Sequence, residues 1–79
     1  MRHAKTGRIF ALVYAQDEHL YVDLKQNLAD IEELVALSPA ITMGRHFDKQ
    51  HWITVDVTTL SSKAELVRLV AVSYRLTDD

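Results

Sequence analysis

Two neighbouring segments near the start of the chain constrain its fold more than any other feature. Residues 9–15 form a short, continuous apolar run, which is typical of a central strand covered on both faces. Residues 19–25 alternate between apolar and polar side chains, as a half-buried strand does. Because only the polar step Gln16-Asp17-Glu18 separates the two segments, we expect an antiparallel hairpin.

The rest of the pattern predicts two helices and a third strand. Asn27 predicts a helix N-cap, and apolar residues at helical spacing follow it until Pro39, before which the helix must end. Residues 41–52 are expected to connect this helix to an alternating strand over residues 53–58, which has one wet face. The step Ser62-Lys63-Ala64-Glu65 fits a capping box at the start of the second helix.

The predicted order is therefore β-β-α-β-α, an α+β fold in which two helices pack on a small antiparallel sheet. In the second helix, Leu66, Val70 and Tyr74 are expected to share the face that packs on the sheet. A hairpin and one more strand make a narrow sheet, so we expect a partner or further residues to supply an edge strand. With 79 residues, the chain is predicted to form one domain over residues 1–79.

Composition limits both the sources of stability and the classes of partner. There is no cysteine, so neither a disulfide nor a thiolate metal site can supplement the small core that a short chain forms. The net charge of −2 and the pI near 6.0 argue against a strongly basic nucleic-acid binder, so any such contact must come from a local patch. The hydrophobic content of 48% favours self-association. Without a signal peptide or a long apolar run, we expect a cytoplasmic protein with no membrane contact.

The stretch from Gly44 to Trp52 holds most of the candidate binding residues. Cations neutralise phosphates and an aromatic face stacks on a base, so a basic-aromatic patch here would bind nucleic acid. The N-terminal cations extend this patch if the entry to the first strand lies nearby. The alternative is a solvated loop in which the tryptophan packs at the edge of the sheet. The candidate nucleic-acid-binding residues are Arg45, His46, Lys49, His51, Trp52, Lys5 and Arg8.

No metal, cofactor or catalytic group is predicted. His46, Asp48 and His51 have the chemistry of zinc ligands, but the separation of the two histidines does not suit one helix face and places them on opposite faces of a strand. They are more simply polar loop residues. The chain has only two glycines and so lacks a Gly-rich phosphate loop, and no carboxylate pair lies in a recognisable cleft. We therefore expect a protein that is not an enzyme.

The same stretch carries a family resemblance. The matching positions are Gly44, His46, Lys49, His51, Trp52, Thr54, Val55, Ser73, Tyr74 and Leu76. On these residues the chain resembles the MmcQ/YjbR family, which has a Gly-aromatic-His step, an Asn-Lys-Lys-His-Trp-like run into a strand, and a closing Ser-Tyr-x-Leu. The run Lys5-Thr6-Gly7-Arg8-Ile9-Phe10 and the strand after it look like the family's Gly-containing hairpin, so the resemblance covers nearly the whole chain.

This resemblance implies a CyaY-like α+β fold with a double-wing motif, and a DNA-binding role. The chain departs from the family pattern in three ways. It starts after the family's N-terminal helix and first strand; Arg45 stands where an aromatic residue is expected; and Asp48 and Gln50 replace Asn and Lys, which removes positive charge from the patch. The two hypotheses are therefore a DNA-binding module, and a protein-interaction or dimerisation domain that does not bind nucleic acid. A homo-oligomer is an expected partner state.

Overall fold

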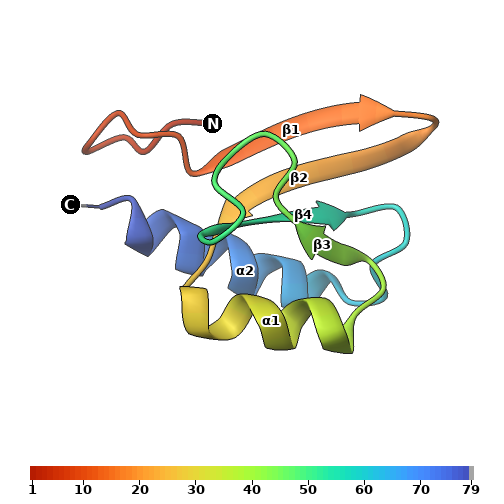
Figure 1. Ribbon diagram of the computed structural model, residues 1–79. Helices are drawn as coiled ribbons and strands as arrows, with labels where there is room; N and C mark the ends of the chain where they lie inside the picture. The colour runs from red at the N-terminus through yellow and green to blue at the C-terminus, as the bar shows by residue number, and fades with distance from the viewer. Residues whose placement is uncertain (79) are drawn as a thin grey trace.

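A four-stranded antiparallel sheet with the strand order β1-β2-β4-β3 forms one layer of the protein, and two helices cover one of its faces (Figure 1). The computed structural model describes residues 1–78. The predicted α+β class, with helices packed on an antiparallel sheet, is confirmed. The elements are β1 (Ala11–Gln16), β2 (His19–Lys25), α1 (Leu28–Leu37), β3 (Ile41–Met43), β4 (Trp52–Asp56) and α2 (Lys63–Leu76).

The β1–β2 hairpin closes on a two-residue turn. Gln16 pairs with His19, and both intervening residues adopt positive φ angles, 52° for Asp17 and 66° for Glu18. Two positive φ angles match the type I′ geometry, whose twist suits the right-handed twist of paired strands. The predicted hairpin is thus confirmed, and its register follows from the turn.

The prediction that the apolar run forms a central strand covered on both faces is wrong. β1 lies at an edge of the sheet, and within it only Ala11 is buried. The helices lie under the other strands, with α2 against β2 and α1 against β3, so the inner face of β1 is only partly covered. A continuous apolar run cannot by itself distinguish a covered strand from an edge strand beside an apolar surface.

The sheet contains one strand more than the predicted order. Part of the expected connection over residues 41–52 forms β3, a short strand that pairs with β4. The alternation of side chains in a strand has a period of two residues, and β3 has only three residues. A strand this short shows no recognisable alternation in the sequence. The chain thus supplies this edge strand of the sheet itself.

Both helices begin at their predicted N-caps, and α1 ends where the sequence predicts. Asn27 is the N-cap of α1, which ends before Pro39, and Ser62 caps α2 by accepting a hydrogen bond from the backbone N–H of Glu65 (3.2 Å). The predicted buried face of α2 is partly wrong. Its fully buried residues are Leu69 and Ser73, whereas Tyr74 is 39% exposed. Leu66 and Val70 pack partly buried against the core.

Ser73 joins α2 to the first two strands. Its Oγ donates to the carbonyl oxygen of Phe10 (2.5 Å) and accepts from the backbone N–H of Lys25 (2.9 Å). One buried hydroxyl therefore satisfies backbone groups at the start of β1 and the end of β2. The hydrophobic core lies between these elements and is formed by Phe10, Ala11, Val22, Leu24, Ile31, Ile41, Ile53, Val55 and Leu69.

Candidate functional site

The face of the sheet opposite the helices, here called the outer face, carries the polar side chains of the strands. Successive side chains of a strand point to opposite faces of the sheet. Val22, Leu24 and Ile53 are buried on the helix side, so their neighbours in the strands, such as Tyr21 and Asp23, point to the outer face. The loop between β3 and β4 rises on this side of the sheet (Figure 1). Its residues contact the outer face and convert part of it into a closed polar network.

Asp23 is the centre of that network. Its side chain is fully buried although it lies on the predicted wet side of β2. Tyr14 and Thr54 donate their hydroxyls to Oδ1 at 3.0 Å and 2.7 Å, and Nδ1 of His46 lies 3.0 Å from Oδ2. A buried carboxylate is stable only when such donors replace water. The carboxylate therefore connects two strands and the loop.

The prediction of a wet face on β4 is wrong at Thr54, which is 1% exposed. The loop covers it, because the backbone N–H of Arg45 donates to Oγ1 of Thr54 at 3.1 Å. That hydroxyl in turn donates to Asp23, so the loop, β4 and β2 form a continuous chain of hydrogen bonds. At the start of the loop, Gly44 lies so close to Trp52 that an added Cβ would be 2.9 Å from the tryptophan Cβ. Glycine is therefore required where the loop leaves the sheet.

Arg45 carries the exposed positive charge of the outer face. Its guanidinium carbon lies 4.4 Å from the centre of the Tyr21 ring, a cation–π contact, and Nη1 is 3.5 Å from Oε1 of Gln16. Within residues 1–78 its guanidinium forms no salt bridge with a carboxylate. The charge of Arg45 is thus held over an aromatic ring and stays available to a ligand.

Two tyrosines and a histidine extend the surface beside Arg45. Tyr14 and Tyr21 are cross-strand partners with stacked rings 5.5 Å apart, and His46 meets the edge of Tyr14 at 4.6 Å. Burial raises the pKa of Tyr14, and the hydrogen bond and negative charge of Asp23 raise it further, against the opposing effect of Thr54. Tyr14 is therefore a neutral hydrogen-bond donor at physiological pH. We call Tyr14, Tyr21, Arg45 and His46 the outer-face cluster.

A second histidine–aspartate pair lies at the far end of the same face. His19 Nδ1 is 2.7 Å from Oδ2 of Asp56, and the His19 ring stacks near Tyr21 with centroids 6.1 Å apart. Burial of Asp56 opposes ionisation, but the hydrogen bond and charge of His19 outweigh it, so the pKa of Asp56 lies below its ordinary value. The pair keeps the imidazole oriented beside Tyr21.

The other candidates from the β3–β4 loop lie elsewhere. Trp52 is half-buried and packs against Phe47 with centroids 4.4 Å apart, which agrees with the interpretation of this tryptophan as a packing residue. His51 pairs with Asp48 at 2.7 Å, and this contact lowers the pKa of the Asp48 carboxyl. Lys49 lines a hollow beside α1 rather than the outer face.

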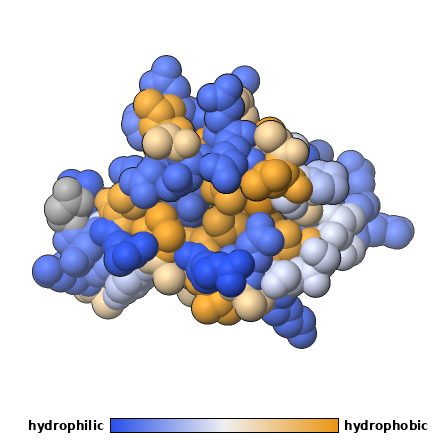
Figure 2. Space-filling view, turned by 90° about the horizontal axis from the view of Figure 1, so that it is seen from below, coloured by the Kyte–Doolittle hydropathy of each residue, from blue (hydrophilic) through white to orange (hydrophobic). Residues whose placement is uncertain are grey.

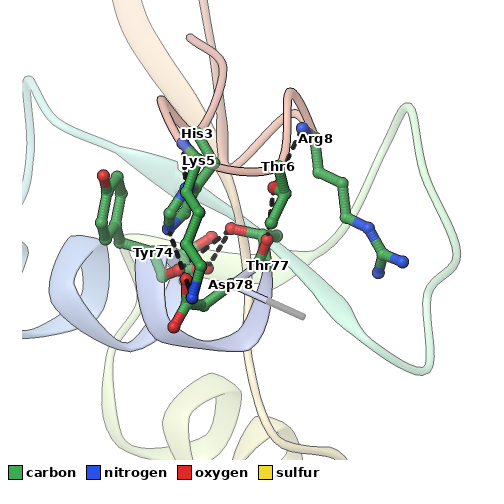
Figure 3. Close-up of polar contacts among 8 residues, drawn as sticks. His3, Lys5, Thr6, Arg8, Tyr74, Thr77 and Asp78 are labelled. Atoms are coloured by element: carbon green, nitrogen blue, oxygen red, sulfur yellow. Dashed lines mark hydrogen bonds and ion pairs between the residues drawn. The ribbon is translucent and has the colours of Figure 1, made fainter.

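Lys5 and Arg8 belong to a different end of the molecule. Figure 3 shows the N-terminal turn fastened to the last turn of α2, with Thr6 Oγ1 donating to the carbonyl of Thr77 at 2.7 Å. Lys5 Nζ lies 3.4 Å from Asp78, so a neighbouring carboxylate already compensates its charge. The side chain of Arg8 extends away from this cluster in Figure 3. The structure gives these two cations no contact with Arg45 or His46.

The side chains considered as metal ligands do not converge. His46 is bonded to Asp23, whereas His51 is bonded to Asp48. Among the residues that the structure describes, no group of three or more histidine, aspartate or glutamate side chains is arranged to hold a metal ion. Neither helix within residues 1–78 has the length and apolar character needed to cross a membrane.

Sequence reasoning missed Tyr14, Tyr21 and Asp23. A signal for them exists: the two-residue turn sets Gln16 opposite His19 and therefore Tyr14 opposite Tyr21. A carboxylate in the middle of an alternating strand is a second signal, because such a residue usually stays in solvent unless donors surround it. The loop that buries Asp23 has no such local signal.

The family described as YjbR matches residues 1–76. The chain belongs to the YjbR family. The resemblance found in the loop and in the closing Ser-Tyr-Arg-Leu step is thus confirmed, and the structure explains the latter: Ser73 joins α2 to the sheet, and Tyr74 stacks on His3 at 3.8 Å. A comparison with curated proteins finds no match.

Solved structures share the fold of this YjbR chain. The crystal structure of a Pseudomonas syringae protein superposes with a TM-score of 0.84 at 26% identity, covering 96% of this chain and 73% of that one. Its solution structure gives 0.77 at 27% identity, covering 96% and 68%. The Deinococcus radiodurans protein DR2400, described by its DUF419 domain, gives 0.80 at 32% identity. This chain covers only 55% of that protein, with 95% of its own length aligned.

Proposed function

We propose that this YjbR protein is a non-catalytic DNA-binding module whose contact surface is the outer-face cluster. The observation that carries the proposal is Arg45, whose guanidinium lies over Tyr21 without a carboxylate partner among the described residues. Arginine held on an aromatic ring contacts phosphate and stacks on bases, and tyrosines on an open sheet face add stacking surface. The helices lie on the opposite face of the sheet, so the part of this face beyond the β3–β4 loop is open to a ligand (Figure 1).

The arrangement of charge supports a weak, salt-dependent interaction. The protein has a net charge of −2, and Asp23 and Asp56 lie beside the two histidines of the outer face. Phosphate contacts are therefore few, so the affinity is expected to be low and to fall only modestly as salt rises.

Fluorescence anisotropy with labelled single-stranded and duplex DNA, at low and physiological salt, tests this proposal. The wild type should bind saturably at low salt, and Arg45→Ala should weaken binding to every sequence and lower the salt slope by about one phosphate contact. Lys49→Ala and Arg8→Ala should have smaller effects, because their side chains lie away from the cluster.

Arg68→Ala is the matched control, since Arg68 is an exposed arginine on α2, on the helix side of the sheet. It removes the same charge from the protein without touching the outer face. Equal losses in Arg45→Ala and Arg68→Ala would point to net charge instead of a site. A lack of saturable binding at low salt would refute the proposal altogether.

A further inference from the structure

We propose that the free edge of β1 is a self-association surface, on which a second copy of this chain pairs its own β1 in antiparallel orientation. The surface combines unpaired backbone groups, exposed apolar side chains and opposite charges at its two ends. It shares Tyr14 with the outer-face cluster, but the proposal does not depend on DNA binding.

The backbone of β1 leaves two residues open for pairing. In a two-residue hairpin the backbone groups of the closing pair, Gln16 and His19, are hydrogen-bonded to each other. Hydrogen-bonded and non-hydrogen-bonded pairs alternate along an antiparallel ladder, so the backbone groups of Tyr14 and Leu12 also bond to β2. The N–H and C=O groups of Val13 and Ala15 therefore point away from the sheet. At Ala11 the equivalent groups are already taken, since Met1 pairs with them from the outside. The open part of the edge thus begins after Ala11.

The helix side of the same edge is apolar and incompletely covered. Val13 is 51% exposed and Leu20 is 44% exposed, and they line a hollow of about 220 Å³ between the hairpin and α2. Figure 2, which views the molecule from below, shows apolar surface gathered in the middle of this side between polar margins. Exposed apolar residues beside an unpaired strand edge favour pairing with another strand.

The charges at the two ends of the β1 edge favour a second copy of this chain as the partner. Asp17 and Glu18 are exposed at one end of β1, and Arg2 lies at the other, where it bridges to Ile9 along the same edge. Within residues 1–78 none of these three charges forms a salt bridge. A two-fold axis reverses the direction of the second strand, so the acidic turn of each copy approaches the arginine of the other.

The register follows from the open groups. Val13 of one copy lies opposite Ala15 of the second copy, and Tyr14 lies on the two-fold axis opposite its own counterpart. This pairing extends the four-stranded sheet into a continuous eight-stranded one. It uses the edge that is six residues long, whereas the opposite edge, β3, has only three.

Sedimentation of the whole chain from about 5 to about 200 µM measures the association constant. The wild type should show a concentration-dependent dimer. Val13→Lys should raise its Kd by at least about tenfold, because a lysine on the edge strand opposes pairing. Met43→Lys is the matched control: Met43 is 47% exposed and lies on the same side of the sheet at the β3 edge. It should leave the Kd unchanged.

A charge-reversal cycle tests the orientation. Arg2→Glu and Glu18→Lys should each raise the Kd about three- to tenfold, the range for exposed ion pairs that occur twice in a dimer, and the double variant should recover wild-type affinity. Circular dichroism checks that each variant is folded. A wild type that remains monomeric at the highest concentration overturns the proposal. So does equal weakening by Met43→Lys, or a double variant weaker than either single one.

Discussion

Replacing Ser73 with alanine is expected to lower the free energy of unfolding by about 2–3 kcal/mol. The hydroxyl is fully buried, donates to the carbonyl of Phe10 at 2.5 Å and accepts from the N–H of Lys25 at 2.9 Å. Alanine removes both hydrogen bonds but cannot remove the backbone groups. The variant therefore leaves polar atoms unsatisfied in the interior.

The magnitude follows from the two groups separately. An unsatisfied buried backbone group costs about 1–3 kcal/mol. The Phe10 bond is buried and takes the middle of that range, whereas the Lys25 bond is partly buried and takes the lower end. Alanine has the better helix propensity, which offsets about 0.5 kcal/mol. The net loss is a large part of the about 4–12 kcal/mol expected for 79 residues.

Urea unfolding followed by Trp52 fluorescence and by circular dichroism measures this loss. Ser61→Ala is the matched control, because Ser61 is exposed just before α2 and should change stability by less than about 0.5 kcal/mol. In a thermal scan, the Ser73 variant should melt at least about 8 °C below the wild type. A loss as small as that of the control would show that water or neighbouring groups replace the hydroxyl, and would refute the reasoning.

Two further predictions concern the loop and the pH dependence of stability. Gly44→Ala should cost about 1–3 kcal/mol in urea unfolding and shift the Trp52 emission, since the added Cβ would lie 3.0 Å from the backbone oxygen of Trp52; an unchanged midpoint would contradict this. The His19 contact lowers the folded-state pKa of Asp56 below its ordinary 3.8, so its contribution is present above that value and is lost as pH falls through the folded-state pKa. In Asp56→Asn the free energy of unfolding should therefore fall less steeply than in the wild type between about pH 5 and pH 3. An equally steep fall in the variant would argue against the pairing of His19 with Asp56.

The candidate site was only partly predictable from the chain. Arg45 and His46 are brought together on the outer face, but the charge pattern alone grouped them with Lys49, Lys5 and Arg8, which lie elsewhere. A sequence pattern records which charges exist and says little about which face a loop turns them to. The direction of this loop depends on its hydrogen bonds to Thr54 and Asp23, which belong to other strands.

Local patterning by itself determined the hairpin, the two helices and their caps, because these depend on side-chain period, turn residues and capping groups within a few residues of one another. Tertiary structure alone decided that β1 is an edge strand, that three residues of a loop pair as β3, and that Asp23 is buried. The same holds for Ser73, whose hydroxyl bonds to a carbonyl 63 residues away. Such contacts form between segments that only packing brings together, so no local period in the chain encodes them.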